Sequence, residues 1–123
     1  MTAARILLLD EAKEDLRDLD GAARRIVAKG IEKLRTEPAQ RGAPLGSRSP
    51  GNLTGLHKLV VGNREFRIVY DVRDDGTIVV VWVIGRRADD EVYRLAVSRL
   101  ETYRADPQKA AILRQMLDTA WSR

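Results

Sequence analysis

The sequence predicts an α+β fold. An N-terminal strand and a helical hairpin precede a three-strand antiparallel meander, which completes a four-stranded twisted sheet. Three observations support this prediction: residues 54–94 hold three β-branched and aromatic runs separated by turn signals, residues 11–34 carry apolar residues at helical spacing, and the C-terminal part shows helical spacing again. Because strands and helices occur in blocks, we expect the helices to pack on one face of the sheet.

Two helices joined by a short link are expected before the meander. Residues 5–9 form a short apolar run that should be the first strand. Residues 11–19 and 23–34 each carry one apolar stripe, which is typical of paired amphipathic helices. Pro38 should end the second helix, and residues 38–52, which contain three Pro and three Gly, are predicted to be a loop.

The meander is predicted from three strands and two turns. Gly62-Asn63 is a two-residue hairpin signal, and the second turn falls at residues 74–76. The third run is almost continuously β-branched and contains Trp82, so this strand should be central and well covered. The strands are expected at residues 56–61, 66–72 and 77–84.

Two helices should follow the meander. The first begins at Asp89 or Asp90 and runs to about Tyr103. The Asp106-Pro107 pair combines a helix cap with a proline at the first helical position, so a last helix should start there. We therefore expect a single domain over residues 1–123, with residues 104–123 as a C-terminal helical extension.

Composition excludes several classes of protein. Cysteine is absent, which excludes disulfides, thiolate metal sites and a thiol nucleophile, and fits a reducing cytoplasm. The N-terminal apolar run is too short for a signal peptide or a membrane span. A chain with 44% hydrophobic and 33% charged residues is typical of a soluble globular protein. We expect a cytoplasmic protein with no membrane partner.

The net charge of +4 is concentrated in one part of the chain. Residues 41–70 hold five Lys or Arg residues and one acidic residue, whereas the flanking parts are balanced. Arg41, Arg48 and Arg64 lie in this region, at predicted loops and turns. A local basic patch attracts ligands that carry phosphate, although it also serves solubility.

Two cations of the predicted hairpin share one face of the sheet. With a two-residue turn at Gly62-Asn63, Lys58 stands directly opposite Arg67, and like charges in that position are destabilising. A four-residue turn would shift the partner by two residues and leave both on the same face. An anion bound between them would relieve the repulsion. Alternatively, both side chains turn into water.

The remaining polar residues restrict the kinds of catalysis that the chain could perform. Arg86 and Arg87 end the third strand, and Tyr93 lies on the next helix, where it serves either core packing or a ligand. His57 is the only histidine, so a pair of imidazoles is excluded, and we interpret it as structural. Catalysis, if present, should need no metal and no cofactor and should rely on Arg, Lys and Tyr to hold a scissile phosphate and stabilise its charge.

Three motifs of the chain are specific enough to indicate a family. They are Leu56-His57-Lys58-Leu59, Phe66-Arg67-Ile68-Val69-Tyr70, and Ile84-Gly85-Arg86-Arg87 followed by Glu91-Val92-Tyr93. In these motifs the chain resembles the RelE/ParE superfamily of bacterial toxins from type II toxin–antitoxin modules, and the last motif looks like the G-(K/H/R)-R…E-V-Y signature of the RelE branch. By order of elements, the resemblance covers roughly residues 5–100.

The resemblance implies a ribosome-dependent endoribonuclease, in which the messenger's own 2′-hydroxyl attacks the adjacent phosphorus and leaves a 2′,3′-cyclic phosphate. Lys58 would lie near the scissile phosphate, and Arg67 would clamp it. Arg87 would stabilise the transition state or protonate the leaving group. Tyr93 would stack on a base or help to deprotonate the 2′-hydroxyl, and Arg86 would touch ribosomal RNA.

The chain departs from the family at one position of the site. At a position where the family has a lysine, this chain has Val60. Either Arg64 or Arg48 would have to supply the missing charge, or activity would fall. Implied partners are a cognate antitoxin, the ribosome and messenger RNA, with operator DNA bound only through the antitoxin complex. Two alternatives stay open: a ParE-like toxin that acts on DNA gyrase, and a degenerate, non-catalytic toxin that acts as a co-repressor.

Overall fold

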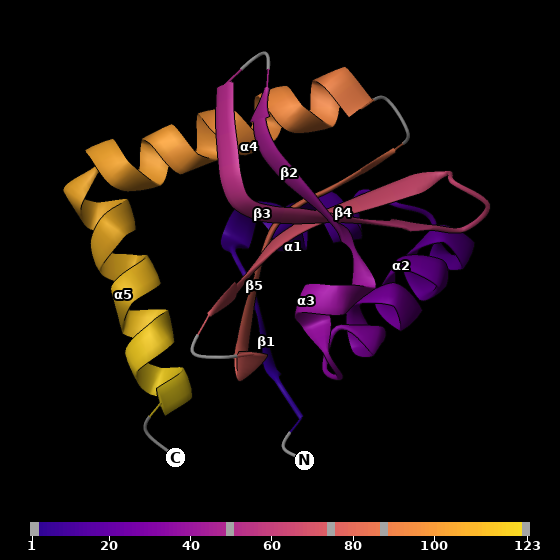
Figure 1. Cartoon of the computed structure of the whole chain (residues 1–123), viewed down its shortest axis with the longest axis horizontal. Coiled ribbons are helices and arrows are strands. Elements are labelled where there is room, and N and C mark those ends of the chain that lie inside the picture. Colours follow the sequence, from indigo (N-terminus) through magenta and orange to yellow (C-terminus); the bar gives the residue numbers. More distant parts are fainter. Residues whose placement is uncertain (1–2, 49–50, 74–75, 87–88, 122–123) are drawn as a thin grey trace.

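The computed structural model describes residues 3–48, 51–73, 76–86 and 89–121, and its elements are arranged as Figure 1 shows. In chain order they are β1 (Arg5–Leu8), α1 (Asp10–Arg17), α2 (Gly21–Lys33), α3 (Pro38–Arg41), β2 (Ala43–Arg48), β3 (Gly51–Val61), β4 (Phe66–Arg73), β5 (Ile78–Arg86), α4 (Asp89–Ala105) and α5 (Pro107–Trp121).

Within the described residues, five strands form one mixed sheet in the order β1-β5-β4-β3-β2. β1 runs parallel to β5, and the other pairs are antiparallel. The predicted α+β class and the meander are confirmed. The fifth strand, β2, comes from the segment predicted to be a loop: Pro44 is tolerated there because β2 is an edge strand, and Gly46 has a φ of 66° at the irregularity in its pairing.

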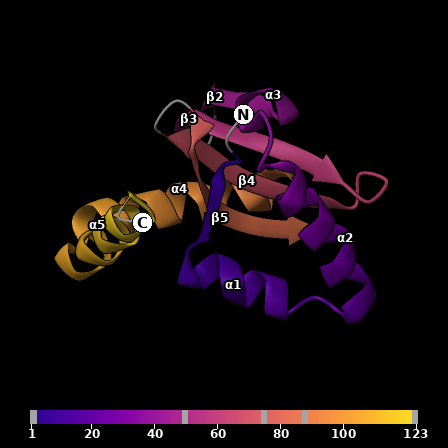
Figure 2. The ribbon, with the colours of Figure 1, turned by 90° about the horizontal axis from the view of Figure 1, so that it is seen from below.

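The helices cover both faces of the sheet, so the prediction that they pack on one face is wrong. The face of Ile68 and Val81 packs against α1 and α2 (Figure 2). The opposite face, with Val69 and Val80, packs against α4 and part of α5. A strand covered on both sides reads as a continuous apolar run, which is the pattern that β5 shows.

A β-bulge changes which residues of β5 face each layer. Val69 pairs with Val83, but the next residue of β4 pairs with Val81, so Trp82 is inserted between them. As a result, Trp82 and Val83 both belong to the core on the α4 side. Beyond the bulge, Gly85 faces α4, because a Cβ atom there would lie 2.8 Å from Cγ2 of Val92. The bulge therefore aims the end of β5 at the first turns of α4.

The C-terminal helix docks on the rest of the protein. Asp106 caps α5 as predicted, since its Oδ1 accepts a hydrogen bond from the Gln108 N–H at 2.9 Å. Leu113 and Met116 pack against the core on the α4 side, and Ala120 is buried. α4 and α5 form a V in Figure 1. None of the helices in the described ranges combines the length and apolar content needed to cross a membrane.

Candidate functional site

The turn between β3 and β4 sets the positions of the two predicted cations. It spans four residues, with the Glu65 N–H donating to the Gly62 carbonyl at 3.0 Å, so Lys58 pairs with Val69 and Arg67 pairs with Val60. The direct Lys58–Arg67 pair of a two-residue turn is therefore wrong. The four-residue alternative holds, and both cations lie on the α4 face as diagonal neighbours, about 7–8 Å apart at the backbone.

Lys58 contacts Tyr93, which comes from the first turns of α4. The Lys58 ammonium donates a hydrogen bond to the Tyr93 hydroxyl at 3.0 Å, and its Nζ lies 5.6 Å from the centre of the phenol ring. Tyr93 is buried, whereas Lys58 is half-buried. The fold thus joins a strand residue and a helix residue that lie far apart in the sequence.

Arg67 is buried on the same face of the sheet. Its side chain is 9% exposed, and Nη1 donates to the Arg64 carbonyl at 2.6 Å. The alternative in which this cation turns into water is wrong. Because Arg64 has a φ of 69°, which is unusual for a residue other than glycine, the guanidinium also braces a strained turn.

Three of the other predicted cations have described side chains, and each of them is exposed. Arg86 lies on the opposite face, over the Phe66 ring at 5.2 Å, and forms an exposed ion pair with Glu65 at 3.6 Å. Arg64 is exposed at the turn, and exposed Arg41 of α3 donates to the Thr36 carbonyl at 3.0 Å. Arg87 lies outside the described residues, as does the side chain of Arg48.

His57 points to the face opposite Lys58. Its ring stacks on Tyr70, with centroids 5.4 Å apart. Burial lowers the pKa of His57, and Asp71 offsets part of this effect. The Tyr70 hydroxyl donates to the Pro38 carbonyl at 2.7 Å, and burial raises the pKa of Tyr70. These contacts anchor α3 to the sheet, which fits a structural role for the histidine.

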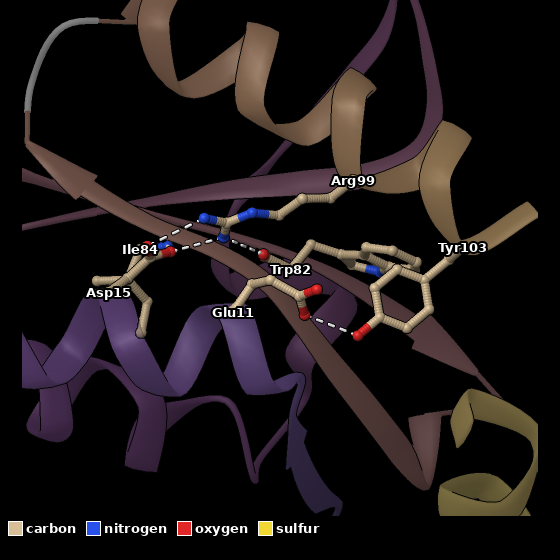
Figure 3. A network of polar contacts seen from close by, with 6 residues as sticks. All are labelled: Glu11, Asp15, Trp82, Ile84, Arg99 and Tyr103. Carbon is tan, nitrogen blue, oxygen red and sulfur yellow. Dashed lines mark hydrogen bonds and ion pairs between the residues drawn. The ribbon is translucent and has the colours of Figure 1, made fainter. Parts of the chain in front are cut away.

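Sequence reasoning missed a polar network that links α1 to α4 (Figure 3). Arg99 of α4 and Asp15 of α1 form a bidentate pair, with Nη1–Oδ2 and Nη2–Oδ1 distances of 2.7 and 3.1 Å. Further along, Glu11 accepts hydrogen bonds from Tyr103 and Lys109, each at 2.7 Å. Side chains this distant in the sequence leave no spacing signal, so no single-sequence pattern predicts these pairs.

Two hollows lie away from Lys58 and Tyr93. One, of about 350 Å³, lies between β1 and α5. The other, of about 200 Å³, lies between the sheet and the C-terminal half of α4, where Asp71 and Arg73 form an ion pair at 2.9 Å. The candidate site is therefore the surface around Lys58, Arg67 and Tyr93, which polar contacts hold in place. Exposed Val60 lies beside them.

Comparisons with known proteins agree on the fold. The family model that matches residues 6–91 is described as the ParE toxin of the type II toxin–antitoxin system parDE. The RelBE2 toxin–antitoxin complex of Mycobacterium tuberculosis contains a chain that is 25% identical; the match covers 71% of this chain and 100% of that one, with a TM-score of 0.59. No curated protein sequence matches at a significant level.

Two further solved structures extend the comparison. An arginine double mutant of the E. coli toxin RelE in the free state is 25% identical, with 80% of this chain and 98% of that chain covered and a TM-score of 0.62. An archaeal RelE–RelB complex from Pyrococcus horikoshii OT3 contains a chain that is 18% identical, with 72% and 98% covered and a TM-score of 0.53, which shows the fold alone. The family match ends at the first turn of α4, so α5 lies outside it.

Proposed function

The chain belongs to the RelE/ParE family of toxins from type II toxin–antitoxin modules, and from this premise we propose that it is a metal-independent endoribonuclease that cuts messenger RNA on the ribosome. The observation that carries the proposal is the contact of Lys58 with Tyr93 on the face that also holds Arg67. Two cations and a phenol on one face suit a phosphodiester, because they supply charge and hydrogen bonds without a metal ligand set.

The proposed reaction is an internal transfer at phosphorus. The 2′-oxygen of the nucleotide attacks the adjacent phosphorus and the bond to the 5′-oxygen breaks, which leaves a 2′,3′-cyclic phosphate and a 5′-hydroxyl. The 2′-hydroxyl loses its proton, and the leaving 5′-oxygen gains one. Negative charge grows on the phosphoryl oxygens during the transfer, so cations fixed before the reaction lower the barrier without reorganising.

Each site residue has a proposed role. Lys58 and Arg67 hold the scissile phosphate. Tyr93 helps to deprotonate the 2′-hydroxyl, because a ring that is 5% exposed offers little face for the alternative of stacking on a base. A phenol can accept the hydrogen bond from Lys58 while it donates its own O–H. Arg87 stabilises the transition state or protonates the leaving oxygen. Arg41, Arg48, Arg64 and Arg86 are proposed to contact ribosomal RNA, and the side chains of Arg41, Arg64 and Arg86 are exposed.

The proposed partners follow from the family. One solved relative, RelBE2 of Mycobacterium tuberculosis, is a toxin–antitoxin complex, which supports a cognate antitoxin for this chain. We propose that this antitoxin holds the toxin inactive, that operator DNA is bound only through their complex, and that the toxin meets translating ribosomes in the cytoplasm. Binding to the ribosome should weaken as salt rises, because phosphate contacts release counterions.

The test is cleavage of a messenger on programmed ribosomes. Lys58→Met should slow cutting by about 10²–10³-fold, the usual cost of removing one group that stabilises charge in the transition state. Tyr93→Phe should slow it by about 10²–10⁴-fold, the usual cost of removing a group that takes part in proton transfer. Lys33→Met is the matched control. Lys33 is an exposed lysine at the end of α2, distant in sequence from Lys58 and Tyr93. The product should end in a 2′,3′-cyclic phosphate. Cutting by Lys58→Met at the rate of the control would refute the assignment.

A ParE-like action on DNA gyrase is the second candidate, because the matching family model is that of the ParE toxin. Inhibition of supercoiling by the purified protein, with no cutting of messenger, would establish it in place of the nuclease. If the purified protein neither cuts messenger RNA nor inhibits supercoiling, the non-catalytic co-repressor is favoured. The uncharged Val60 is the observation that supports this alternative.

A further inference from the structure

In the part of the chain that the structure describes, side chains rather than a strand cover the edge of β5 beyond the end of β1. β1 pairs with β5 only along residues 78–81, whereas β5 extends beyond them. On this edge the Ile84 N–H donates to Asp15 Oδ2 at 3.0 Å, and the Trp82 carbonyl accepts from Arg99 Nη1 at 2.9 Å (Figure 3). The carboxylate of Asp15 and the guanidinium of Arg99 thus form the hydrogen bonds that a neighbouring strand would otherwise make with these backbone groups.

The same two side chains also bond to each other. The side chains of Asp15 and Arg99 are 17% and 15% exposed, so the pair is largely shielded from water. Asp15 belongs to α1 on one face of the sheet, and Arg99 belongs to α4 on the other. In Figure 3 the bridge passes around the edge of β5 between these two helices. Charge-assisted bonds in a bidentate pair are short and directional, so the bridge fixes both distance and orientation.

The apolar contacts of α4 do not fix its position in this way. Ala96 is fully buried, and Val92 lies over Gly85, but burial of apolar surface is not directional and tolerates small slides or rotations of a helix. A bidentate ion pair with two further backbone contacts does not tolerate them. Arg99 therefore adds directional contacts to the apolar packing of α4.

Arg99 follows Tyr93 by six residues, or about 9 Å along a helix that rises 1.5 Å per residue. A helix is stiff over this length, so an anchor at Arg99 also fixes the place of the Tyr93 ring. We propose that Asp15 and Arg99 are positioning residues that hold Tyr93 against Lys58, with Asp15 acting only through Arg99. The inference rests on the proposed function for its catalytic consequence, although the positioning can be measured without it.

A second set of side-chain hydrogen bonds, called here the Glu11 clamp, joins α1 to α4 and α5 and provides a matched control. Glu11 of α1 accepts from Tyr103 of α4 and from Lys109 of α5, each at 2.7 Å. Tyr103 lies ten residues beyond Tyr93, or about 15 Å along the helix axis. Loss of the Glu11 clamp leaves the Arg99 contacts intact, so it should loosen α5 without moving Tyr93.

The direct test observes Tyr93 itself. The three tyrosines can be labelled with [4-¹³C]tyrosine, and the Tyr93 signal identified by its loss in Tyr93→Phe. Lys58→Met gives the position of this signal without the ammonium contact. Arg99→Lys keeps the charge but not the bidentate geometry, and Asp15→Asn keeps an oxygen for Ile84 but not the charge. Glu11→Gln is the control, and every variant is compared well below its melting temperature.

We expect Arg99→Lys and Asp15→Asn to move the Tyr93 signal toward its position in Lys58→Met, and Glu11→Gln to leave it unchanged. Single-turnover cutting should fall about 10–100-fold in the first two variants, the cost of misplacing a reacting group by up to about 1 Å, with KM unchanged. A Tyr93 signal at the wild-type position in folded Asp15→Asn would overturn the proposal, as would one that does not respond to Lys58→Met.

If Arg99→Lys does not fold, Asp15→Asn decides alone. If the wild-type protein cuts no RNA, the proposed nuclease fails, while the Tyr93 signal still decides whether Arg99 positions this residue.

Discussion

Gly85 offers a way to displace the candidate site with one methyl group. A Cβ atom at this position would lie 2.8 Å from Cγ2 of Val92. Carbon atoms in good contact are about 3.5–4.0 Å apart, so Gly85→Ala must move the two groups apart by roughly 0.7–1.2 Å. Val92 belongs to a packed helix and directly precedes Tyr93, so we expect the first turns of α4 to tilt away from the sheet about the Arg99 contacts and to carry Tyr93 with them.

The effects on stability and on activity should differ in size. Overpacking costs about 1–3 kcal/mol, and replacing a strand glycine returns about 0.5–1 kcal/mol, so the free energy of unfolding should fall by roughly 0–2.5 kcal/mol. A displacement of about 1 Å can cost about 10²-fold in rate. Gly85→Ala should therefore stay folded at 25 °C while its single-turnover cutting of messenger falls by one to two orders of magnitude.

Gly30→Ala is the matched control. A Cβ atom at Gly30 would lie 2.8 Å from Val61 Cγ1 and 3.1 Å from Ile68 Cδ1, which is similar crowding on the α2 face. It should lower stability by a similar amount and spare cutting. The reasoning would be refuted if Gly85→Ala cut RNA at the wild-type rate, because Val92 would then have moved aside without moving the helix.

Two further predictions concern the supports of the site. Tyr70→Phe leaves the buried Pro38 carbonyl without its donor, so the urea midpoint should fall by the equivalent of about 1–3 kcal/mol with an unchanged m-value; an unaltered midpoint would contradict this. Burial raises the pKa of Glu11, but hydrogen bonds from Lys109 and Tyr103 outweigh it, and the net pKa lies below the usual value. A lowered pKa in the folded state stabilises the protein above about pH 4.3, where the unfolded carboxyl is ionised, and this contribution is lost as pH falls further. The stability difference between wild type and Glu11→Gln should therefore shrink in acid, and a difference independent of pH would count against the Glu11 clamp.

The sequence was most informative where periodicity alone decides the structure. The strand carrying Phe66, Ile68 and Tyr70 follows from an apolar residue at every second position, and the last helix follows from its Asp106-Pro107 start. The family motifs also lie on the predicted elements. Lys58 could be placed on the face of Arg67 from the side-chain period of two, whether the turn held two or four residues.

The features that could not be predicted depend on partners distant in sequence. β2 exists because β3 is available beside it, and its Pro and Gly residues resemble those of a loop. The bulge at Trp82 has no local signal, because every neighbouring residue is apolar on both faces. The turn after Val61 follows Gly62-Asn63 but spans four residues, since Arg67 binds the carbonyl of Arg64 and stabilises its positive φ.

The family match and the structural matches point to relatives with different names, so the fold alone does not choose between a nuclease and a gyrase inhibitor. A substitution at Tyr93 distinguishes the nuclease from the gyrase inhibitor. The Tyr93 side chain is 5% exposed, so the oxygen removed by Tyr93→Phe adds almost nothing to a docking surface. A toxin that acts by occupying a protein partner should hardly respond to this change. A toxin that cuts a phosphodiester at the Lys58–Tyr93 contact should lose turnover while its fold and its affinity for the ribosome persist.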